Sequence, residues 1–460
     1  MLNVKDFGAQ GDGVSKDTAP LRAALQNGGT IFFPAGTYLT GSLKIQSKTT
    51  LYFAAGARLL ASPDEADYFA ADYDEDSRHD RHPSPYFFPE EGTAQYGLLY
   101  ANRSEEIRIF GGTLVADDRS YCREEPIASV ITDENSIFAP EYFRQPSSWR
   151  RPIRPRPKMM LFKNCRDVKI EGLRVEKAPC FSGWFLHCES MLFDRLTVRN
   201  DYDQPCADGL HFSSCKDVLV KNGDFYCGDD CIAVDCAYGK PCENITVEHC
   251  VLETSIHAVR VYSGLDLDVI YGRDTGAYVK NIRIENCRIR EGCAALLINA
   301  CDGDISDVTF QNNVMEQTFP GTALCFTANE GVISNIRVEN FRFRGNGAGY
   351  FYAEKNGRID GVTVKNCIFE IEPKPKAWGD GYDAMITHAY SLPYRFVLKN
   401  ADNVTFDNAD IHIGDFDLSE YTPSDLAALK DAIGPERFNA ILAPVKETIS
   451  SDHCKNFRKI

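Results

Sequence analysis

A repeated phrase, roughly N-C-x-x-V-x-I-x-x-x-x-V, constrains the fold of this chain more than any other feature of its sequence. It occurs as NCRDVKIEGLRV, SCKDVLVKNGDF, VKNIRIENCRIR, ISNIRVENFRFR and in five further variants from residue 158 onward. The first apolar residue after each turn marks the copies, at steps of 23, 27, 27, 37, 26, 28, 26 and 42 residues. These markers are Val168, Met191, Val218, Ile245, Ile282, Val308, Ile336, Val362 and Val404.

A basic step in the twenties is typical of a solenoid, whose repeats run roughly 20–45 residues. No single repeat buries its own apolar face, so stacking makes the core continuous. The sequence therefore predicts an all-β fold, a right-handed parallel β-helix built as a single-stranded solenoid. Alternating apolar residues should point inward, and the recurrent Asn and Cys residues should form ladders at the turns. A leucine-rich repeat array is the competing interpretation, but its L-x-x-L-x-L phrase is absent.

The first 60 residues contain the predicted N-terminal cap of the solenoid. Residues 15–25 favour a short helix, because Ser15 or Asp17 can cap it and one of its faces is apolar. That face consists of Leu21, Ala24 and Leu25. The preceding GAQGDG lacks the Lys-Ser/Thr of a phosphate-binding loop, so a tight turn is favoured. Strands bounded by Gly, Pro or Ser-Lys turns are expected at Thr30–Phe33, Tyr38–Thr40, Leu43–Ile45 and Thr50–Phe53.

Two segments interrupt the pattern. Residues 62–93 are rich in acids, His, Arg, Pro and aromatic residues, and residues 117–157 are rich in Arg and Pro. Loops of this length are uncommon unless they are functional, and insertions in a solenoid project from one face. We therefore expect a β-helix domain over residues 1–415 in which these two insertions build a binding surface.

Residues 416–460 change character and predict a C-terminal helical extension. Thr422 can cap a helix, Pro423 suits its first position, and Asp425 complements the helix dipole. Such a helix would cover the open sheet edge of the last coil. The alternative is that its apolar stripe forms a homo-oligomer contact; the stripe consists of Leu426, Leu429 and Ile433.

Charge and hydropathy exclude several partners. The formal net charge of −16 argues against nucleic-acid binding, which depends on Lys and Arg neutralising phosphates. There is no run of about 20 apolar residues, so no membrane contact is expected. The chain starts MLNVKDFGAQ, without the basic and apolar regions of a signal peptide, which predicts a cytoplasmic protein, or a secreted one if a signal had been removed.

The 17 cysteines are an odd number, and many occupy equivalent repeat positions. Without an export signal, buried reduced thiols are expected. Cys227 and Cys231 are close in sequence, but no second pair completes a four-ligand zinc site. We therefore expect neither a metal nor a cofactor.

The chemistry is concentrated in Cys206–Val234, which contains Asp208, Asp229 and Asp230 among apolar and small residues. Asp208 and Asp229 are 21 residues apart, about one coil. Neighbouring strands lie about 4.8 Å apart, so three carboxylates would crowd one patch and at least one pKa should rise. A protonated carboxyl beside an ionised one is what hydrolysis of a glycosidic bond requires. Asp residues that only cap β-helix turns are the structural alternative.

Several segments, in order, resemble glycoside hydrolase family 28, the polygalacturonase family. They are NVKDFGAQGDGVSKDT, GGTIFFPAGTY, the NC repeats, CADGLHF, GDDCIAV and SIHAVRVYSG, and they cover roughly residues 1–415. The resemblance implies a right-handed parallel β-helix that hydrolyses pectic glycosides with inversion. Asp208 matches the Asp of the family's Asn-Thr-Asp, Gly228-Asp229-Asp230 matches Gly-Asp-Asp, and His257 matches the His of Gly-His-Gly. Leu297-Ile298-Asn299 stands where the family has Arg-Ile-Lys, so two basic residues are missing.

On this resemblance we assign Asp229 as general acid, and Asp208 with Asp230 as the pair that deprotonates water. The expected substrate-binding residues are His257, Arg260, His211 and Asn299, with Arg260 as a replacement for the lost cations. The predicted function is a glycoside hydrolase on pectin-type or related oligosaccharides, exo-acting because the insertions can close one end of a groove. The alternative is a β-helix carbohydrate-binding protein, lyase or epimerase without hydrolase activity.

Overall fold

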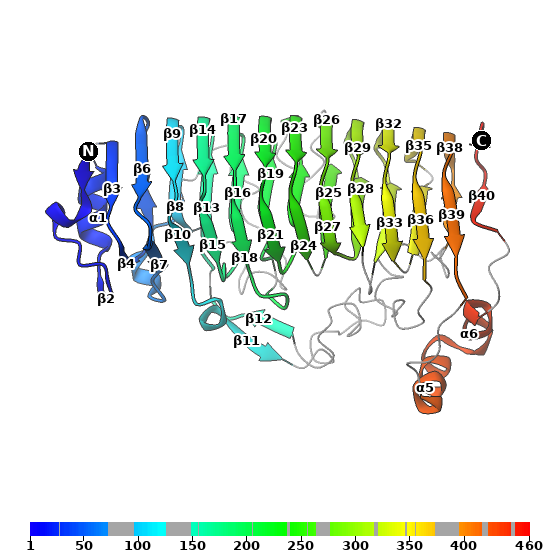
Figure 1. Ribbon diagram of the computed structural model, residues 1–460, viewed down its shortest axis with the longest axis horizontal. Helices are drawn as coiled ribbons and strands as arrows, with labels where there is room; N and C mark the ends of the chain where they lie inside the picture. The colour runs from blue at the N-terminus through cyan, green and yellow to red at the C-terminus, as the bar shows by residue number, and fades with distance from the viewer. Residues whose placement is uncertain are drawn as a thin grey trace.

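The computed structural model describes residues 1–71, 96–125, 149–236, 240–263, 277–316, 321–372, 395–415, 422–442 and 447–460, except residues 27, 155, 205, 255, 346 and 355. Nearly all described strands belong to three long parallel sheets, here named A, B and C. The chain passes from A to B to C in each coil and then starts the next coil (Figure 1). The fold is therefore the predicted right-handed parallel β-helix, with the hand that parallel crossovers take.

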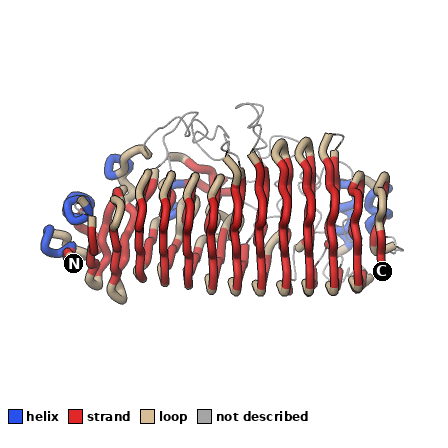
Figure 2. The backbone as a smooth tube through the Cα atoms, turned by 90° about the horizontal axis from the view of Figure 1, so that it is seen from above, coloured by secondary structure: helices blue, strands red, loops and turns tan. Residues whose placement is uncertain are grey.

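The strands of each sheet lie side by side as rungs, and the two termini lie at opposite ends of the stack (Figure 2). Sheet A contains β1 Leu2–Asn3, β3 Gly29–Phe33, β6 Thr49–Phe53, β9 Glu105–Phe110, β14 Arg166–Glu171, β17 Glu189–Asp194, β20 Lys216–Lys221, β23 Cys242–Glu248, β26 Tyr278–Glu285, β29 Asp304–Gln311, β32 Val332–Glu339, β35 Arg358–Lys365, β38 Ala401–Asp407 and β41 Arg458–Lys459. Sheet B contains β2 Asp12–Lys16, β4 Gly36–Thr40, β7 Ala57–Ala61, β10 Thr113–Val115, β15 Arg174–Glu176, β18 Thr197–Arg199, β21 Asp224–Cys227, β24 Val251–Thr254, β27 Arg288–Glu291, β30 Val314–Glu316, β33 Arg342–Gly345, β36 Ile368–Ile371 and β39 Asp410–Ile413.

Sheet C carries the residues of greatest chemical interest. It contains β5 Leu43–Lys44, β8 Gly97–Asn102, β13 Lys158–Lys163, β16 Gly183–Leu186, β19 Leu210–Ser213, β22 Ile232–Asp235, β25 His257–Ser263, β28 Ala294–Ala300, β31 Thr322–Ala328, β34 Gly347–Ala353, β37 Phe396–Lys399 and β40 Ile449–Asp452. A separate antiparallel hairpin consists of β11 Cys122–Glu125 and β12 Trp149–Pro152.

The predicted repeat register is confirmed. All nine marker residues are successive Cα partners across sheet A, from Val168 to Val404. Each lies almost wholly inside the core, because alternate residues of a strand face the interior. A step of 37 or 42 residues therefore lengthens the turns and leaves the pairing unchanged.

Side-chain ladders at the turns, also predicted, are present. The amide of Asn408 donates to Asn366 at 2.9 Å, and that of Asn340 donates to Asn312 at 2.9 Å. The asparagines stand in the left-handed region, where their short polar side chains are tolerated. Cys188 lies between Cys165 and Cys215 of the neighbouring coils, and none of the 17 cysteines forms a disulfide.

The N-terminal cap differs in detail from its prediction. The helix α1 Thr18–Leu25 starts three residues later than predicted, because Asp12–Lys16 joins sheet B as β2. Its predicted apolar face is buried. Asp17 does not cap the helix through its side chain; its carboxylate accepts the backbone N–H groups of Gln10 and Gly11 at 2.5 and 2.8 Å. Three short 3-10 helices are η1 Val4–Phe7, η2 Glu65–Asp67 and η4 Asp118–Tyr121.

The C-terminal segment differs more. Its helices α5 Pro423–Ile433 and α6 Pro435–Leu442 do not end the fold, since β40 and β41 then pair with β37 and β38 in the last coil. The helices are thus an insertion, and α5 lies away from the sheets (Figure 1). Leu426 is half-buried, whereas the side chains of Leu429 and Ile433 lie outside the described ones, so the homo-oligomer contact stays a prediction.

Four of the long insertions share one position in the coil. Residues 62–96, 116–157, 372–395 and 414–448 each connect a strand of sheet B to the next strand of sheet C. The structure therefore groups the predicted insertions at one edge of sheet C, as expected of a solenoid. Most of 62–93 and the middle of 117–157 lie outside the described residues. Among the described helices, none is long and apolar enough to cross a membrane.

Candidate active site

Three of the predicted site residues lie on adjacent coils at the turn from sheet B to sheet C. Asp208 precedes β19, Asp230 precedes β22 and His257 begins β25. The N–H of Gly209 donates to the carbonyl oxygen of Asp230 at 2.9 Å, and that of Cys231 donates to that of His257 at 3.0 Å. The one-coil spacing in the sequence thus stacks these residues at the turn from sheet B to sheet C, where the four long insertions also lie.

Gly228 makes room for this turn. A Cβ atom at this position would lie 2.4 Å from the carbonyl oxygen of Asp201 and 2.5 Å from that of Gln204. The turn of the preceding coil, residues 200–209, therefore passes directly against Gly228. Any larger residue would push this turn away from the aspartates.

The two oxygens of the Asp229 carboxyl are held by backbone donors. The N–H of Asp230 donates to Oδ1 at 2.9 Å, and the N–H of Cys206 donates to Oδ2 at 3.2 Å. Cys206 has a φ of 56°, in the left-handed region that non-glycine residues seldom adopt. Such strained backbone is often found at functional sites, and here it turns an N–H toward Asp229.

The environment separates the pKa values of the three carboxyls. Burial, followed by the charges of Asp208 and Asp230, raises the pKa of Asp229 well above its ordinary value. Burial also raises the pKa of Asp208 to about 6, although His211 opposes this shift. Burial acts the same way on Asp230, but the contact with His257, together with the charges of Arg260 and His211, outweighs burial and lowers that pKa. A protonated carboxyl beside ionised ones is the arrangement that acid/base hydrolysis needs.

The side chains of His257 and Arg260 approach Asp230. The Nδ1 of His257 lies 2.7 Å from Oδ1, and the guanidinium of Arg260 lies 3.9 Å from Oδ2. Arg260 also stacks over the ring of Tyr262, with 4.3 Å from its Cζ to the ring centroid. The structure therefore brings His257 and Arg260 to the carboxylates, as their proposed roles require.

His211 lies between two carboxylates. Its Nδ1 is 3.2 Å from Asp208, and its Nε2 is 2.6 Å from Asp235. The hydroxyl of Tyr262 lies 3.0 Å from the same Nε2. These contacts connect His211 to the site through Asp208, and its substrate-binding role stays a prediction.

Asn299 lies farther along sheet C. It is the register partner of Tyr262, one coil on, and Leu297 is the partner of Arg260. Its Oδ1 accepts a hydrogen bond from the thiol of Cys301 at 3.2 Å. Asn299 thus extends the same row of side chains, and Arg260 is the cation one coil before the position of Leu297.

The sequence agrees with this geometry. The family described as Glycosyl hydrolases family 28 matches residues 141–323, and one described as Rhamnogalacturonase A/epimerase, pectate lyase-like matches residues 1–59. The first match contains all the aspartates of the site. The chain is similar to glycosyl hydrolases family 28 over residues 141–323.

Curated relatives of the chain include a "Probable polygalacturonase" of Vitis vinifera, 23% identical over 302 residues, which are 61% of this chain and 53% of the relative. An "Exo-poly-alpha-D-galacturonosidase" of Dickeya chrysanthemi is 23% identical over 403 residues, 79% of this chain and 59% of the relative. The chain thus spans somewhat over half the length of these relatives.

Solved family 28 structures share the fold. The family 28 exopolygalacturonase of Yersinia enterocolitica superposes with a TM-score of 0.65 at 18% identity, covering 99% of this chain and 77% of that chain. The exopolygalacturonase of Thermotoga maritima gives a TM-score of 0.53 at 16% identity, covering 89% and 91%. These likenesses support the β-helix over nearly the whole chain.

Sequence reasoning missed Asp235 and Tyr262, which lie in this candidate site. Both follow apolar residues near the ends of their strands, and they are register partners on β22 and β25. The available signal was the strand period, which places Asp235 at the end of the strand that follows Asp230, five residues further on. A single acid at the end of an apolar strand is usually a turn residue, so this signal was weak.

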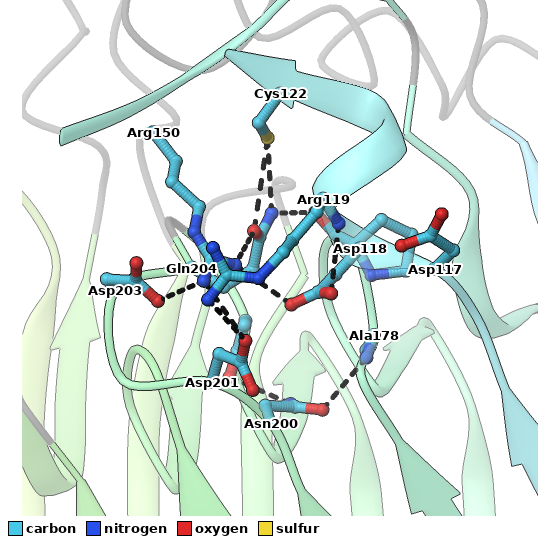
Figure 3. A network of polar contacts seen from close by, with 12 residues as sticks. Asp117, Asp118, Arg119, Cys122, Arg150, Ala178, Asn200, Asp201, Asp203 and Gln204 are labelled. Atoms are coloured by element: carbon cyan, nitrogen blue, oxygen red, sulfur yellow. Dashed lines mark hydrogen bonds and ion pairs between the residues drawn. The ribbon is translucent and has the colours of Figure 1, made fainter. Parts of the chain in front are cut away.

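A third missed residue, Arg150, joins the hairpin to the turn before Asp208 (Figure 3). Its guanidinium is almost fully buried and lies 3.0 Å from Asp118, 3.0 Å from Asp201 and 2.6 Å from Asp203. It also donates to the side-chain oxygen of Gln204 at 3.0 Å. Arg150 belongs to β12, and two of the three acids belong to the turn that leads to Asp208.

The same turn is fixed from beneath. The side-chain amide of Asn200 donates to the carbonyl oxygen of Ala207 at 3.1 Å and to the hydroxyl of Ser182 at 2.9 Å. Asn200 also accepts the N–H of Ala178 at 3.0 Å (Figure 3). These contacts therefore connect the hairpin β11–β12 to the turn that leads to Asp208. Among the described residues, no group of three or more His, Cys, Asp or Glu side chains could hold a metal ion.

Proposed function

We propose that this family 28 chain is an inverting glycoside hydrolase that removes terminal units from pectin-type or related oligosaccharides. The observation that carries the proposal is the separation of pKa values among three stacked aspartates, upward for Asp229 and downward for Asp230. An acid and a base with opposite environments are what a two-carboxylate hydrolysis requires.

The proposed reaction assigns proton donation to Asp229 and activation of water to Asp208 and Asp230. Asp229 gives its proton to the glycosidic oxygen as the bond from that oxygen to the anomeric carbon breaks. A water held by Asp208 and Asp230 attacks the anomeric carbon from the opposite face. The proton of this water passes to one of the two carboxylates. That carboxylate then releases the proton to solvent and Asp229 takes one up from solvent, which restores the starting state.

Exo action is supported by the hairpin β11–β12. It leaves the solenoid just before β13, on the N-terminal side of the aspartates, and Arg150 fixes it to the turn that carries Asp208. A substrate lying along sheet C would contact the hairpin and the turn before Asp208 next to the three carboxyls. The site then accepts a chain end rather than the middle of a polymer.

The choice of sugar is the finest part of the proposal. Leu297 and Asn299 replace the two basic residues that the family resemblance predicts, and Arg260 is the cation that reaches the carboxylates in the described part of sheet C. We therefore propose that Arg260 binds a uronate where the substrate carries one, and that neutral sugars of related oligosaccharides are also accepted.

Product analysis tests this function. Pectic, rhamnogalacturonan and neutral oligosaccharides are each incubated with the full chain, and the anomer of the first product is read by NMR. We expect steady release of one mono- or disaccharide with inverted configuration. Early mixed-length products with a rapid fall in polymer viscosity would contradict exo action, and retained configuration would contradict the assigned roles.

A further inference from the structure

The two-carboxylate reaction as stated uses Asp208 but gives no role to Asp235 and His211, which are linked to it in the buried chain of contacts Asp235–His211–Asp208. Its three members come from β22, β19 and the turn before β19, and all are nearly inaccessible to solvent. Asp235 lies 2.6 Å from the Nε2 of His211, and Asp208 lies 3.2 Å from its Nδ1. The hydroxyl of Ser213 donates to the same oxygen of Asp235 at 2.8 Å.

The two contacts determine the charge of the imidazole. A neutral imidazole has one N–H donor, whereas His211 faces a carboxylate at each nitrogen. Two buried carboxylates without a cation between them would be strongly destabilising. Burial alone would lower the pKa of His211, but its hydrogen bonds to Asp208 and Asp235 outweigh burial and raise it to about 10.

Aromatic rings enclose this imidazolium. The ring centroid of Phe181 lies 5.1 Å from that of His211, and those of Tyr262 and Trp184 lie 6.1 and 6.3 Å away. The ammonium of Lys158 lies over Trp184 and Phe181, at 5.6 and 5.8 Å from their centroids. These rings keep solvent from the histidine, which strengthens its contacts with the carboxylates.

Other charges reach the same centre. Asp230 interacts electrostatically with both His211 and Asp208, and Arg260 of β25 approaches Asp230 at 3.9 Å. The ionisable groups that interact with the His211–Asp208 pair in the described residues therefore include Asp235, Asp229, Asp230 and Cys180, with Arg260 acting through Asp230. Among them, Asp235 is the one that contacts the far side of the imidazole.

We propose that Asp235 is a positioning residue, which holds His211 as an imidazolium so that its Nδ1–H orients an ionised Asp208 toward the attacking water. This inference rests on the proposed function for its catalytic meaning. Asp235 itself touches neither substrate nor water in this assignment; it acts through His211. The imidazolium thereby keeps Asp208 ionised beside the negative charge of Asp230.

The variant Asp235→Asn separates charge from shape. Its side chain has the same size, and its amide can donate to Nε2, which favours the neutral tautomer that still donates from Nδ1 to Asp208. The variant loses the negative charge of Asp235 and the positive charge of His211 together. Since His211 is the nearer of the two to Asp208, the net effect raises the pKa of Asp208.

The first measurement is the pH profile of kcat/KM. We expect Asp235→Asn to move the acid limb upward by about one pH unit, the size of effect that a nearby opposite charge produces, with KM little changed at high pH. His211→Gln should move the limb in the same direction, and the double variant should move it no further, because the two residues act as one unit. Ser213→Ala, which removes a donor to Asp235 without changing charge, should leave the limb in place. An equal shift in Ser213→Ala, or additive shifts in the double variant, would overturn the inference.

A second measurement does not depend on any substrate. Nitrogen-15 NMR of the full chain at about pH 8, between the ordinary and the raised histidine pKa, should show one imidazole with both nitrogens protonated. That signal should vanish in His211→Gln and become a neutral histidine in Asp235→Asn. A neutral His211 in the unmodified protein overturns the inference. A doubly protonated His211 in a protein that cleaves none of the oligosaccharides would instead contradict the proposed function alone.

Discussion

Asp208 and Asp230 are direct neighbours on adjacent coils, joined by the hydrogen bond from the N–H of Gly209 to the carbonyl oxygen of Asp230 at 2.9 Å. Two buried carboxylates so placed would repel each other. Each contacts a histidine, Asp208 through the Nδ1 of His211 and Asp230 through the Nδ1 of His257. Asp229 alone of the three has no histidine partner among the described contacts.

Asp229→Asn should abolish most of the activity. The amide keeps an oxygen for one of the two backbone donors, Asp230 at Oδ1 or Cys206 at Oδ2, but has no acidic proton to give to a leaving group. Loss of a general acid lowers kcat by about 10²–10⁴-fold. The measurement is kcat on whichever oligosaccharide the unmodified protein cleaves. Glu189→Gln, an exposed change on sheet A, is the matched control and should leave kcat unaltered.

The same variant should be more stable than the unmodified protein at high pH. The pKa of Asp229 is raised in the folded state, so the folded protein keeps a proton that the unfolded chain releases above about 3.8. Stability therefore falls as pH rises from that value toward the folded-state pKa. The amide of the Asp229→Asn variant cannot ionise, so the variant escapes this loss. Urea unfolding at pH 4 and pH 8 should give a difference that grows with pH, by about 1 kcal/mol or more; a constant difference would show that the Asp229 pKa is ordinary.

The repeat made the strand register of sheet A predictable to the residue, whereas the residues of the site were predictable only in part. The markers Val168 to Val404 fall into register because every coil obeys the same alternation, which is a local rule of the strand. Asp208, Asp229 and Asp230 could be found because the coil length places them together. The residues that hold the turn before Asp208 could not be predicted, because Arg150 and Asp118 come from an insertion whose path no repeat constrains.

The prediction for the C-terminal segment was wrong for a related reason. Residues 449–459 complete the last coil after a helical insertion, but they contain too few apolar residues to repeat the phrase of the earlier coils. The helix pattern that starts at Thr422 therefore predicts an end of the β-helix before residues 449–459. Tertiary pairing with β37 and β38, rather than local propensity, decides the conformation of these residues.

Arg260→Met should reveal the charge of the substrate. Removing the guanidinium leaves Asp230 with His257, which stays 2.7 Å away, so neutral substrates should be hydrolysed with little change in kcat. A uronate substrate would lose a charge-assisted contact of about 1.5–3 kcal/mol, which raises KM by roughly 10–100-fold. Kinetics on matched uronate and neutral oligosaccharides make the comparison. An equal rise in KM for both classes would mean that Arg260 acts by packing on Tyr262.

Arg150→Met should release the hairpin from the site. The change leaves Asp118, Asp201 and Asp203 without their shared cation, and breaking a buried ion pair in this way destabilises by about 3–5 kcal/mol. Arg150→Lys should recover only part of this stability, since an ammonium cannot match the fork of a guanidinium. Arg119→Met is the control, because its exposed contact with Asp201 at 3.4 Å contributes about 0–1 kcal/mol.

The product profile adds a functional readout to the same variant. If the hairpin closes one end of the binding surface, Arg150→Met should release oligomers of mixed length from a polymer that the unmodified protein shortens only from its end. Urea unfolding gives the stability, and chromatography of early products gives the mode of attack. Should the variant be destabilised as expected yet still release a single terminal unit, the hairpin would stabilise the turn before Asp208 without closing the site, and the exo-acting geometry would have to come from another insertion at the same edge of sheet C.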